Sequence, residues 1–336
     1  MSGIKTKRES QKILITGTAG FIGYHLASAL LERGDIVVGV DNFTPYYDVR
    51  MKEARHEILK KNKSFHFYNI SIANYKDLEK VIKKEKPEII VHLAAQAGVR
   101  FSLKNPWAYA DANFLGTLNI FEVARQFGIK RVLYASSSSV YGDNKKMPFS
   151  EDDRTDNPIS VYAATKKGNE MLAYSYHSLY GIETAGMRFF TVYGRYGRPD
   201  LALFKFTKNI IAGKPIDVYN RGKMKRTFTH ISDIVSGILA LIEKKKLKYE
   251  LYNLGGDEST TLLDFIKIIE LRLGKKATMN MLPMQAGDVP AAVADTSKAC
   301  CDLNYSSRVS IEDGVADFVD WFIENKKWLL RLKDPK

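Results

Sequence analysis

The chain has 336 residues, a formal net charge of +13 and 45% hydrophobic residues, enough for a sizeable core. No run approaches the ~18 consecutive apolar residues of a membrane-spanning helix, so no membrane association is expected. The lysines are dispersed and no nucleic-acid-binding motif accompanies them, so no nucleic-acid partner is expected; an anionic small substrate fits the same charge. Residues 1–11 are polar and lack the apolar centre of a signal peptide, which predicts a disordered lead-in and a cytoplasmic protein.

The first half alternates short apolar runs with helical segments. The runs span residues 12–16, 36–40, 65–69, 88–93, 130–135 and 184–189. Near-continuous apolar strands between helices are typical of a parallel sheet covered on both faces. We therefore predict a Rossmann-type doubly wound α/β fold over residues 12–198. Residues 199–336 are predicted to form mainly a smaller mixed α/β lobe, with strands at 217–220 and 252–254 and some segments returning to the main sheet.

A glycine-rich turn follows the first predicted strand. Gly17, Gly20 and Gly23 form a G-x-x-G-x-x-G pattern that runs into a helix through Phe21 and Ile22. Such glycines allow a tight turn, close approach of a pyrophosphate and close packing of helix on strand. The free N–H groups of the helix then face the phosphates, so the pattern predicts a dinucleotide site.

Asp41 ends the second predicted strand and is followed by Asn42. A carboxylate here can accept hydrogen bonds from the adenosine ribose and would repel a 2′-phosphate, which favours NAD over NADP. A later strand ends in a sequence whose small residues would let the cofactor lie against the sheet: Leu93, Ala94, Ala95 and Gln96.

Tyr162 and Lys166 are four residues apart in a predicted helix over 161–180, so they share one face. A nearby ammonium favours the phenolate and should lower the pKa of the tyrosine. A serine cluster ends the strand upstream and can share the proton of a substrate alcohol with Tyr162. A non-catalytic NAD-binding module is the alternative, but such a module has no need of all three groups.

Several longer motifs carry a family resemblance over nearly the whole chain. They are Asp41-Asn42 with Tyr46-Tyr47-Asp48-Val49, the segments 92–100, 188–194 and 197–200, and the segment 283–289. With these motifs the chain resembles the extended short-chain dehydrogenases that modify nucleotide sugars, and within them the UDP-glucuronate 4-epimerase family. The resemblance departs at Asn69, where Asp is common, and at Ala286, where Pro is usual and whose change should loosen its loop.

The resemblance implies roles for individual residues. Tyr162 would be the base and acid, Lys166 its electrostatic partner and Ser137 the third catalytic hydroxyl. The cofactor would also meet Asn69 and Ile70. Ser138, Ser139, Thr191 and Arg198 would surround the sugar carboxylate, and Arg100 and Ser102 would lie near the sugar and diphosphate. Tyr219 would contact the uracil, Arg226 the diphosphate, and Asp288 the uridine end.

These roles imply reversible C4 epimerisation of UDP-glucuronate to UDP-galacturonate, through a 4-keto intermediate and with resident NAD. Ser138 and Ser139 stand where decarboxylating and dehydrating relatives carry acidic residues, which favours epimerisation. A UDP-glucose/UDP-galactose 4-epimerase and a UDP-glucuronate decarboxylase remain alternatives. The adjacent Cys300 and Cys301 make no disulfide framework, and no metal site is expected.

Two long helices, predicted at 107–126 and 161–180, carry apolar residues on more than one face. Two such helices from each subunit can pair across a two-fold axis into a four-helix bundle. We therefore expect a homodimer, as the resemblance also implies.

Overall fold

The computed structural model of the chain describes residues 9–285 and 288–334. Ala286 and most of the lead-in predicted for residues 1–11 lie outside the described residues. At the end of that lead-in, the Ser10 hydroxyl donates to the carbonyl of Gly34 at 2.9 Å. The backbone N–H of Gln11 donates to the Asp35 carboxylate at 3.0 Å. These bonds join the start of the first strand to the turn that follows the first helix.

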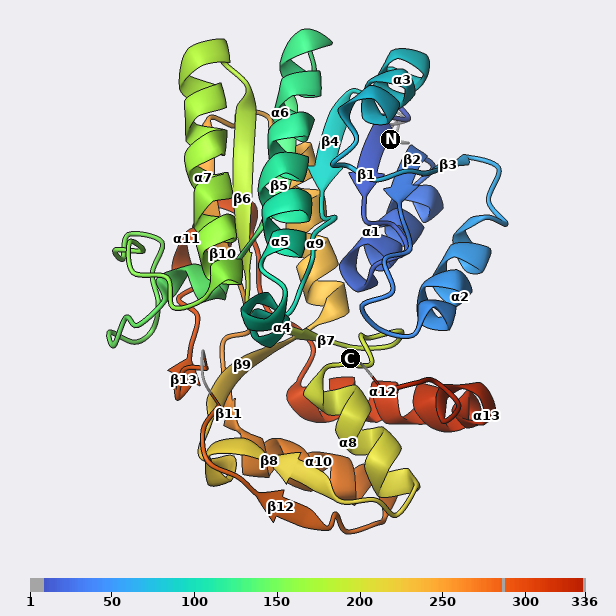
Figure 1. Cartoon of the computed structure of the whole chain (residues 1–336), viewed down its shortest axis with the longest axis vertical. Helices are drawn as coiled ribbons and strands as arrows, with labels where there is room; N and C mark the ends of the chain where they lie inside the picture. The colour runs from blue at the N-terminus through green and yellow to red at the C-terminus, as the bar shows by residue number, and fades with distance from the viewer. Residues whose placement is uncertain (1–8, 286–287, 335–336) are drawn as a thin grey trace, which may run out of the picture.

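A seven-stranded parallel sheet forms the larger half of the molecule (Figure 1). Its spatial order is β10-β6-β5-β4-β1-β2-β3. The strands are β1 (Lys12–Thr16), β2 (Ile36–Asp41), β3 (Phe65–Asn69), β4 (Ile89–His92), β5 (Arg131–Ser137), β6 (Glu183–Phe189) and β10 (Tyr249–Leu254). The strand order reverses beside β1, as in a doubly wound sheet. The predicted Rossmann-type fold is confirmed, and the predicted strand at 252–254 is the end of β10 in this sheet.

Both faces of the sheet are buried, because successive side chains of a strand point to opposite sides. Ile13 and Ile15 of β1 pack into one apolar cluster, whereas Leu14 packs into the other. The first cluster includes helices α1 (Phe21–Glu32) and α9 (Ile231–Glu243). The second includes α3 (Tyr75–Glu85), α6 (Gly116–Gln126) and α7 (Val161–Tyr180). Figure 1 shows α6 and α7 side by side on this face.

The helix predicted over 107–126 is not uniform. It consists of α5 (Trp107–Tyr109), a π-helical segment (Ala110–Leu115) and α6. Asn113 in the π segment accepts a hydrogen bond from the Gln96 backbone N–H at 2.8 Å. Its amide donates to the Gln96 carbonyl and to Thr165 Oγ1, each at 3.1 Å. These tertiary bonds accompany the widened turn, and apolar periodicity does not reveal them.

The second lobe lies beyond the carboxyl ends of the large sheet (Figure 1). Its helices are α8 (Ala202–Ile211), α10 (Leu262–Leu273), α12 (Ile311–Glu324) and α13 (Lys326–Leu329). Its strands are β7 (Thr191–Tyr193), β8 (Ile216–Val218), β9 (Lys225–His230), β11 (Ser259–Thr261), β12 (Met279–Met281) and β13 (Ala291–Ala292). The strand predicted at 217–220 ends at Val218, because a 3₁₀ turn (Tyr219–Gly222) follows with Asn220 and Arg221 in left-handed conformations.

The remaining elements pack against helices and strands of the larger half. They are α2 (Val49–Leu59), α4 (Val99–Lys104), α11 (Ser297–Leu303) and a 3₁₀ turn (Ser138–Tyr141). An apolar cluster in the second lobe includes Tyr47 and Met51 from the larger half, so the two halves share packing. No helix among the described residues is long and apolar enough to cross a membrane. Within residues 9–285 and 288–334, no group of three His, Cys, Asp or Glu side chains is placed to hold a metal ion.

Candidate active site

A cavity of about 950 Å³ lies between the carboxyl ends of the large sheet and the second lobe. In an open α/β sheet, this edge is where ligands bind. The predicted site residues that line it are Gly17, Gly20, Phe21, Ile22, Gly23, Asp41, Asn42, Ile70, Leu93, Ala94, Ala95, Gln96, Arg100, Ser137, Ser138, Ser139, Tyr162, Lys166, Thr191, Arg198, Tyr219, Arg226 and Asp288. Residues far apart in sequence are therefore brought to one cavity.

The glycine-rich turn is packed too tightly for side chains. Gly17 has φ +81°, and a Cβ there would lie 2.8 Å from the Ala94 nitrogen. A Cβ on Gly23 would lie 2.0 Å from the Gly17 carbonyl oxygen. Helix α1 begins at Phe21 without a side-chain cap, so its first N–H groups remain available at the cavity. This cradle fits a pyrophosphate held by backbone N–H groups.

Asp41 is buried beside the glycine-rich turn. One carboxylate oxygen accepts the Ala19 N–H at 3.0 Å, and the other accepts the Phe43 N–H at 2.9 Å. Lys52 Nζ lies 3.8 Å from the second oxygen and also lines the cavity. Each oxygen keeps a further lone pair, so the carboxylate both fixes the turn and can accept from ribose hydroxyls. Sequence reasoning did not identify Lys52.

Tyr162 and Lys166 lie near the start of α7, whose first turn is capped by Ser160. The Ser160 hydroxyl accepts the Ala163 N–H at 3.1 Å. Lys166 Nζ donates to the Ala135 carbonyl of β5 at 2.8 Å, and burial lowers the pKa of Lys166 to about 8. The cap and this bond fix the register of the helix against the strand that carries Ser137.

Burial raises the pKa of Tyr162, although a hydrogen bond with Ser137 and the positive charge of Arg198 oppose that rise. The predicted net lowering of the Tyr162 pKa is therefore wrong for the protein without its cofactor. Desolvation of the phenolate outweighs the favourable interactions. The Ser137 hydroxyl also donates to Ser139 Oγ at 3.0 Å, so hydroxyl groups line the cavity beside the phenol.

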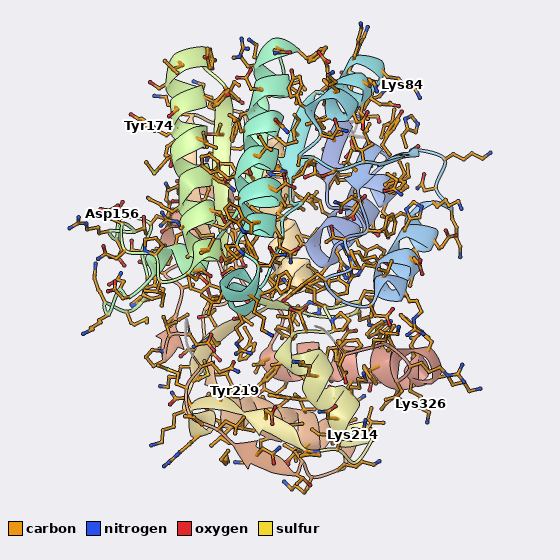
Figure 2. All side chains as sticks on the ribbon, viewed as in Figure 1. Lys84, Asp156, Tyr174, Lys214, Tyr219 and Lys326 are labelled. Carbon is orange, nitrogen blue, oxygen red and sulfur yellow. The ribbon has the colours of Figure 1, made fainter. Side chains whose placement is uncertain are left out.

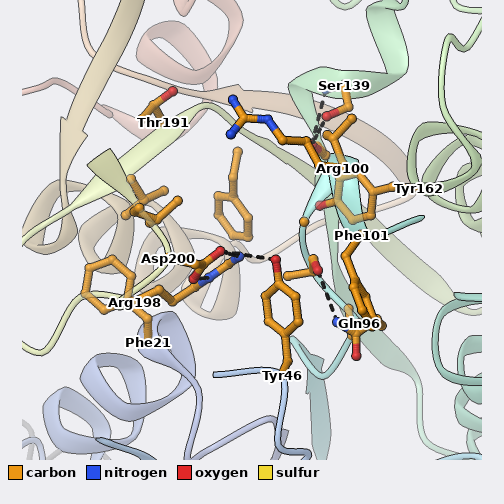
Figure 3. Close-up of a pocket in the computed structure, with 18 of the residues that line it drawn as sticks. Phe21, Tyr46, Gln96, Arg100, Phe101, Ser139, Tyr162, Thr191, Arg198 and Asp200 are labelled. Atoms are coloured by element: carbon orange, nitrogen blue, oxygen red, sulfur yellow. Dashed lines mark hydrogen bonds and ion pairs between the residues drawn. The ribbon is translucent and has the colours of Figure 1, made fainter. Parts of the chain in front are cut away.

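Arg198 is held on two sides. Its Nε donates to Asp200 Oδ1 at 2.9 Å and its Nη2 donates to Asp200 Oδ2 at 2.5 Å. The guanidinium carbon lies 5.7 Å from the centroid of the Tyr46 ring, and the Tyr46 hydroxyl donates to Asp200 Oδ2 at 3.4 Å (Figure 3). Asp200 and Tyr46 both line the cavity, and neither was assigned a role from the sequence.

A second arginine–aspartate pair joins the two halves across the cavity. Arg100 of α4 donates to Asp288 at 2.9 Å, and its guanidinium carbon lies 5.0 Å from the Tyr219 ring centroid. Arg226 of β9 instead donates to the carbonyls of Lys225 and Val289, each at 2.8 Å. Burial lowers the pKa of Arg226. Three guanidinium groups therefore line one cavity, and no carboxylate hydrogen-bonds the third among the described residues.

Two residues assigned from the resemblance do not line the cavity. The Ser102 hydroxyl is buried and donates to the Val99 carbonyl of its own short helix at 2.6 Å. Asn69 is exposed at the end of β3, and the next residues, Ile70 and Ser71, line the cavity instead. Their side chains are thus turned to other partners or to the surface.

Arg55 of α2 was not identified from the sequence and is fully buried. One amino group donates to the Ala19 carbonyl at 2.8 Å and to the Tyr47 hydroxyl at 2.7 Å. The other donates to the Tyr196 carbonyl at 2.6 Å and to the Gly197 carbonyl at 3.3 Å. One side chain therefore connects the glycine-rich turn with the segment that leads to Arg198. Neither spacing nor residue type gives a signal for this role.

Known proteins resemble the chain over nearly its whole length. It is 44% identical to the UDP-glucuronate 4-epimerase of Thermodesulfobacterium geofontis, over 95% of this chain and 98% of the relative. The structure of UDP-glucuronic acid 4-epimerase from Bacillus cereus, in complex with UDP-glucuronic acid and NAD, is 36% identical with a TM-score of 0.89, over 94% of this chain and 99% of that one. UDP-glucose 4-epimerase of Thermotoga maritima, solved with UDP-glucose, is 29% identical with a TM-score of 0.85, over 94% and 99%.

The family match agrees with the glycine-rich turn and with the tyrosine and lysine of α7. Residues 13–255 match the NAD dependent epimerase/dehydratase family, and the chain belongs to that family.

Proposed function

We propose that the protein is a UDP-glucuronate 4-epimerase that interconverts UDP-glucuronate and UDP-galacturonate with resident NAD. The observation that carries the proposal is the set of hydroxyl groups around Tyr162. Ser137 hydrogen-bonds with the Tyr162 phenol, and Ser138 and Ser139 line the same cavity where an additional acid or base would have to stand. The similarity to UDP-glucuronate 4-epimerases supports the same substrate.

The residues present fit NAD. A Cβ on Gly17 or Gly23 would collide with backbone, so this turn keeps the space that a pyrophosphate needs. Asp41 would take the adenosine ribose, and Lys166, four residues after Tyr162, would reach the nicotinamide ribose. When bound, NAD supplies the hydride acceptor for the sugar C4 and a positive charge beside the phenol.

Tyr162 would remove the proton from the 4-hydroxyl and return it after the sugar has turned. Ser137 would share that proton, because its hydroxyl hydrogen-bonds with the phenol. The Ala135 carbonyl accepts a hydrogen bond from Lys166 Nζ, and this bond would keep the ammonium near the phenol. Net epimerisation needs the keto sugar to rotate about its link to the diphosphate, so the UDP must be held more firmly than the sugar.

The guanidinium groups support such an arrangement. Arg226 has no carboxylate hydrogen-bonded to it among the described residues, and Asp288 acts on it only through its charge, so no protein carboxylate competes by a hydrogen bond with the diphosphate. Arg100 already has Asp288 as a partner and covers the ring of Tyr219. We assign Tyr219 to the uracil and Asp288 to the uridine end, with Arg100 exchanging Asp288 for phosphate when the nucleotide binds.

The chemistry of the intermediate argues against two relatives' reactions. A 4-keto uronate is a β-keto acid and loses CO₂ readily when the breaking bond aligns with the carbonyl. Ser139, Thr191 and Arg198 line the cavity and could hold the carboxylate out of alignment. Dehydration needs a further acid or base to remove the C5 proton, and positions 138 and 139 supply only hydroxyl groups.

The test is to offer UDP-glucuronate, UDP-glucose and UDP-xylose separately and to identify the products by NMR. We expect UDP-galacturonate from the first, without pentose product. Predominant turnover of UDP-glucose would instead establish the neutral-hexose epimerase, and release of CO₂ would establish the decarboxylase.

We also propose that the protein acts as a homodimer through α6 and α7. Exposed apolar side chains lie on α7 and on the adjoining α5, with Leu179 71% exposed, Met171 63% and Trp107 of α5 80%. Tyr174 projects from the outer side of α7 (Figure 2) and is 58% exposed. A four-helix bundle across a two-fold axis would cover them. Light scattering at micromolar concentration should give a dimer, and Met171→Lys should give a monomer.

A cytoplasmic location is part of the proposal. Cys300 and Cys301 are both exposed free thiols, which a reducing compartment preserves. Fractionation of the source cells tests this directly, and recovery in a secreted fraction would contradict it.

A further inference from the structure

Arg198 has a specific hydrogen-bonding edge that is already occupied. Carboxylates bind a guanidinium most strongly through two parallel hydrogen bonds. Asp200 takes the Nε and Nη2 groups of Arg198 in this way. A sugar carboxylate therefore cannot use the same edge while Asp200 stays in place. Among the described residues, Nη1 of Arg198 donates to no protein acceptor. This nitrogen is therefore the donor that Arg198 has left for a carboxylate in the cavity.

The Arg198–Asp200 pair is part of the cavity wall and is packed by neighbouring side chains. The side chains of Arg198 and Asp200 are 20% and 11% exposed, and both line the cavity. The Arg198 charge lowers the pKa of Asp200 against the effect of burial, so Asp200 is ionised at neutral pH. The Tyr46 hydroxyl donates to Asp200, while the Tyr46 ring packs against the Arg198 guanidinium and against Phe101. Figure 3 shows Tyr46, Arg198 and Asp200 together at one side of the cavity.

The pair also changes the charge that the substrate meets. Arg198 alone would present a full positive charge in a partly enclosed space, where attraction to a carboxylate is stronger than in water. Asp200 cancels most of that charge at contact distance. The sugar carboxylate then meets one guanidinium end, the hydroxyl groups of Ser139 and Thr191, and a second carboxylate behind the guanidinium.

We propose that Asp200 is a specificity-determining residue that limits how tightly the site holds the sugar carboxylate, because it neutralises the Arg198 guanidinium and occupies its Nε–Nη2 edge. The inference rests on the proposed epimerase function. Rotation of the keto sugar requires the carboxylate to leave its first contacts. A two-pronged salt bridge would stabilise the bound ground state without helping the reaction, and it would slow that departure. With Asp200 in place, the site still recognises the acid but does not hold its carboxylate through two parallel hydrogen bonds.

The test compares Asp200→Asn with the parent protein. Asparagine has nearly the same shape and can still accept one hydrogen bond from Arg198, but it no longer neutralises the guanidinium. We expect the Kd of UDP-glucuronate to fall by about tenfold, whereas the Kd of UDP-glucose changes by less than about twofold. We expect kcat on UDP-glucuronate to fall by about the same factor, because tighter ground-state binding has to be undone.

Three further variants serve as controls for this comparison. Asp320→Asn removes the same charge from a surface arginine–aspartate pair with Arg272, and it should change neither constant. Asp200→Glu keeps the carboxylate and should restore most of the parent ratio of the two Kd values. If Asp200→Asn does not fold, Asp200→Ser carries the same expectation. Binding is measured by calorimetry, and turnover is measured by NMR.

The outcomes separate the two proposals. If the parent protein does not convert UDP-glucuronate to UDP-galacturonate, the proposed function is wrong. If it does, but the ratio of the two Kd values is the same in Asp200→Asn as in the parent, the role of Asp200 is wrong and the function stands. A weaker Kd for the acid in the variant would also overturn the inference, since it would make Asp200 a support for the binding geometry.

Discussion

The ammonium group of Lys166 donates a hydrogen bond to the carbonyl oxygen of Ala135 at 2.8 Å, in a place where burial lowers the lysine pKa from 10.5 to about 8. The bond fixes α7 to β5, but the buried charge costs stability. Because the folded pKa lies below the ordinary value, that cost is fully present below pH 8 and disappears above pH 10.5.

Lys166→Met should therefore stabilise the cofactor-free protein at pH 7, by roughly 1–3 kcal/mol, because methionine fills similar space without a charge. The advantage should shrink steadily between pH 8 and pH 10. Urea unfolding at several pH values measures it. An advantage that is independent of pH would mean that packing, and not the buried charge, is responsible. Turnover should be lost in the same variant.

Tyr162→Phe should lower turnover of UDP-glucuronate by ~10²–10⁴-fold, because the ring stays while the proton-transferring oxygen is removed. The Kd of UDP should change little, since the phenol is assigned to the sugar end of the cavity. Tyr75→Phe, where α3 meets α6 and away from the cavity, removes a hydroxyl that donates to Gln126 and serves as the matched control. Near-parent turnover in Tyr162→Phe would show that another group is the base.

Asp41→Ala should weaken NAD binding by roughly 1–3 kcal/mol, because the ribose and two backbone N–H groups lose one acceptor. Both of those N–H groups, from Ala19 and Phe43, belong to the cofactor side of the cavity. Fluorescence titration of NAD into stripped protein gives the affinity. Asp77→Ala, on the exposed start of α3, controls for the lost charge. A strict requirement for NADPH in the parent protein would contradict the assignment.

Arg198→Ala should reduce kcat/KM for UDP-glucuronate by about tenfold or more beyond any effect on UDP-glucose, because only the acid loses a charge-assisted hydrogen bond. Ser139→Ala should release some pentose product from the same substrate if its hydroxyl helps to hold the carboxylate. NMR of both reactions gives the ratio. Equal losses on the acid and the neutral sugar would place carboxylate recognition elsewhere.

The large sheet could be predicted because its signals are local. The strands that end in Thr16, Asp41 and His92 are continuous apolar runs, and α7 begins and ends where its pattern predicts. The glycines, Tyr162 and Lys166 were also accessible, since each motif spans a few residues of one turn or helix. The structure then brings these motifs to one cavity.

The unpredicted features depend on contacts between distant segments. The π-helical segment around Asn113 is accompanied by bonds to Gln96 and Thr165, which apolar periodicity cannot report. The neighbours Arg198 and Asp200 could be read as a turn, but their pairing edge is visible only in space. The direction of the Tyr162 pKa was mispredicted, because sequence identifies a nearby lysine but not the burial of the phenol.

Arg55 links, through hydrogen bonds, two segments that lie more than a hundred residues apart in the chain. Its guanidinium bonds the carbonyl oxygens of Ala19, in the cofactor turn, and of Tyr196 and Gly197, just before Arg198. A shift of either stretch must stretch bonds to the other. Substitutions at positions 198–200 that change the sugar preference are therefore expected to weaken NAD binding as well. Variants selected for a new sugar should be tested for loss of NAD.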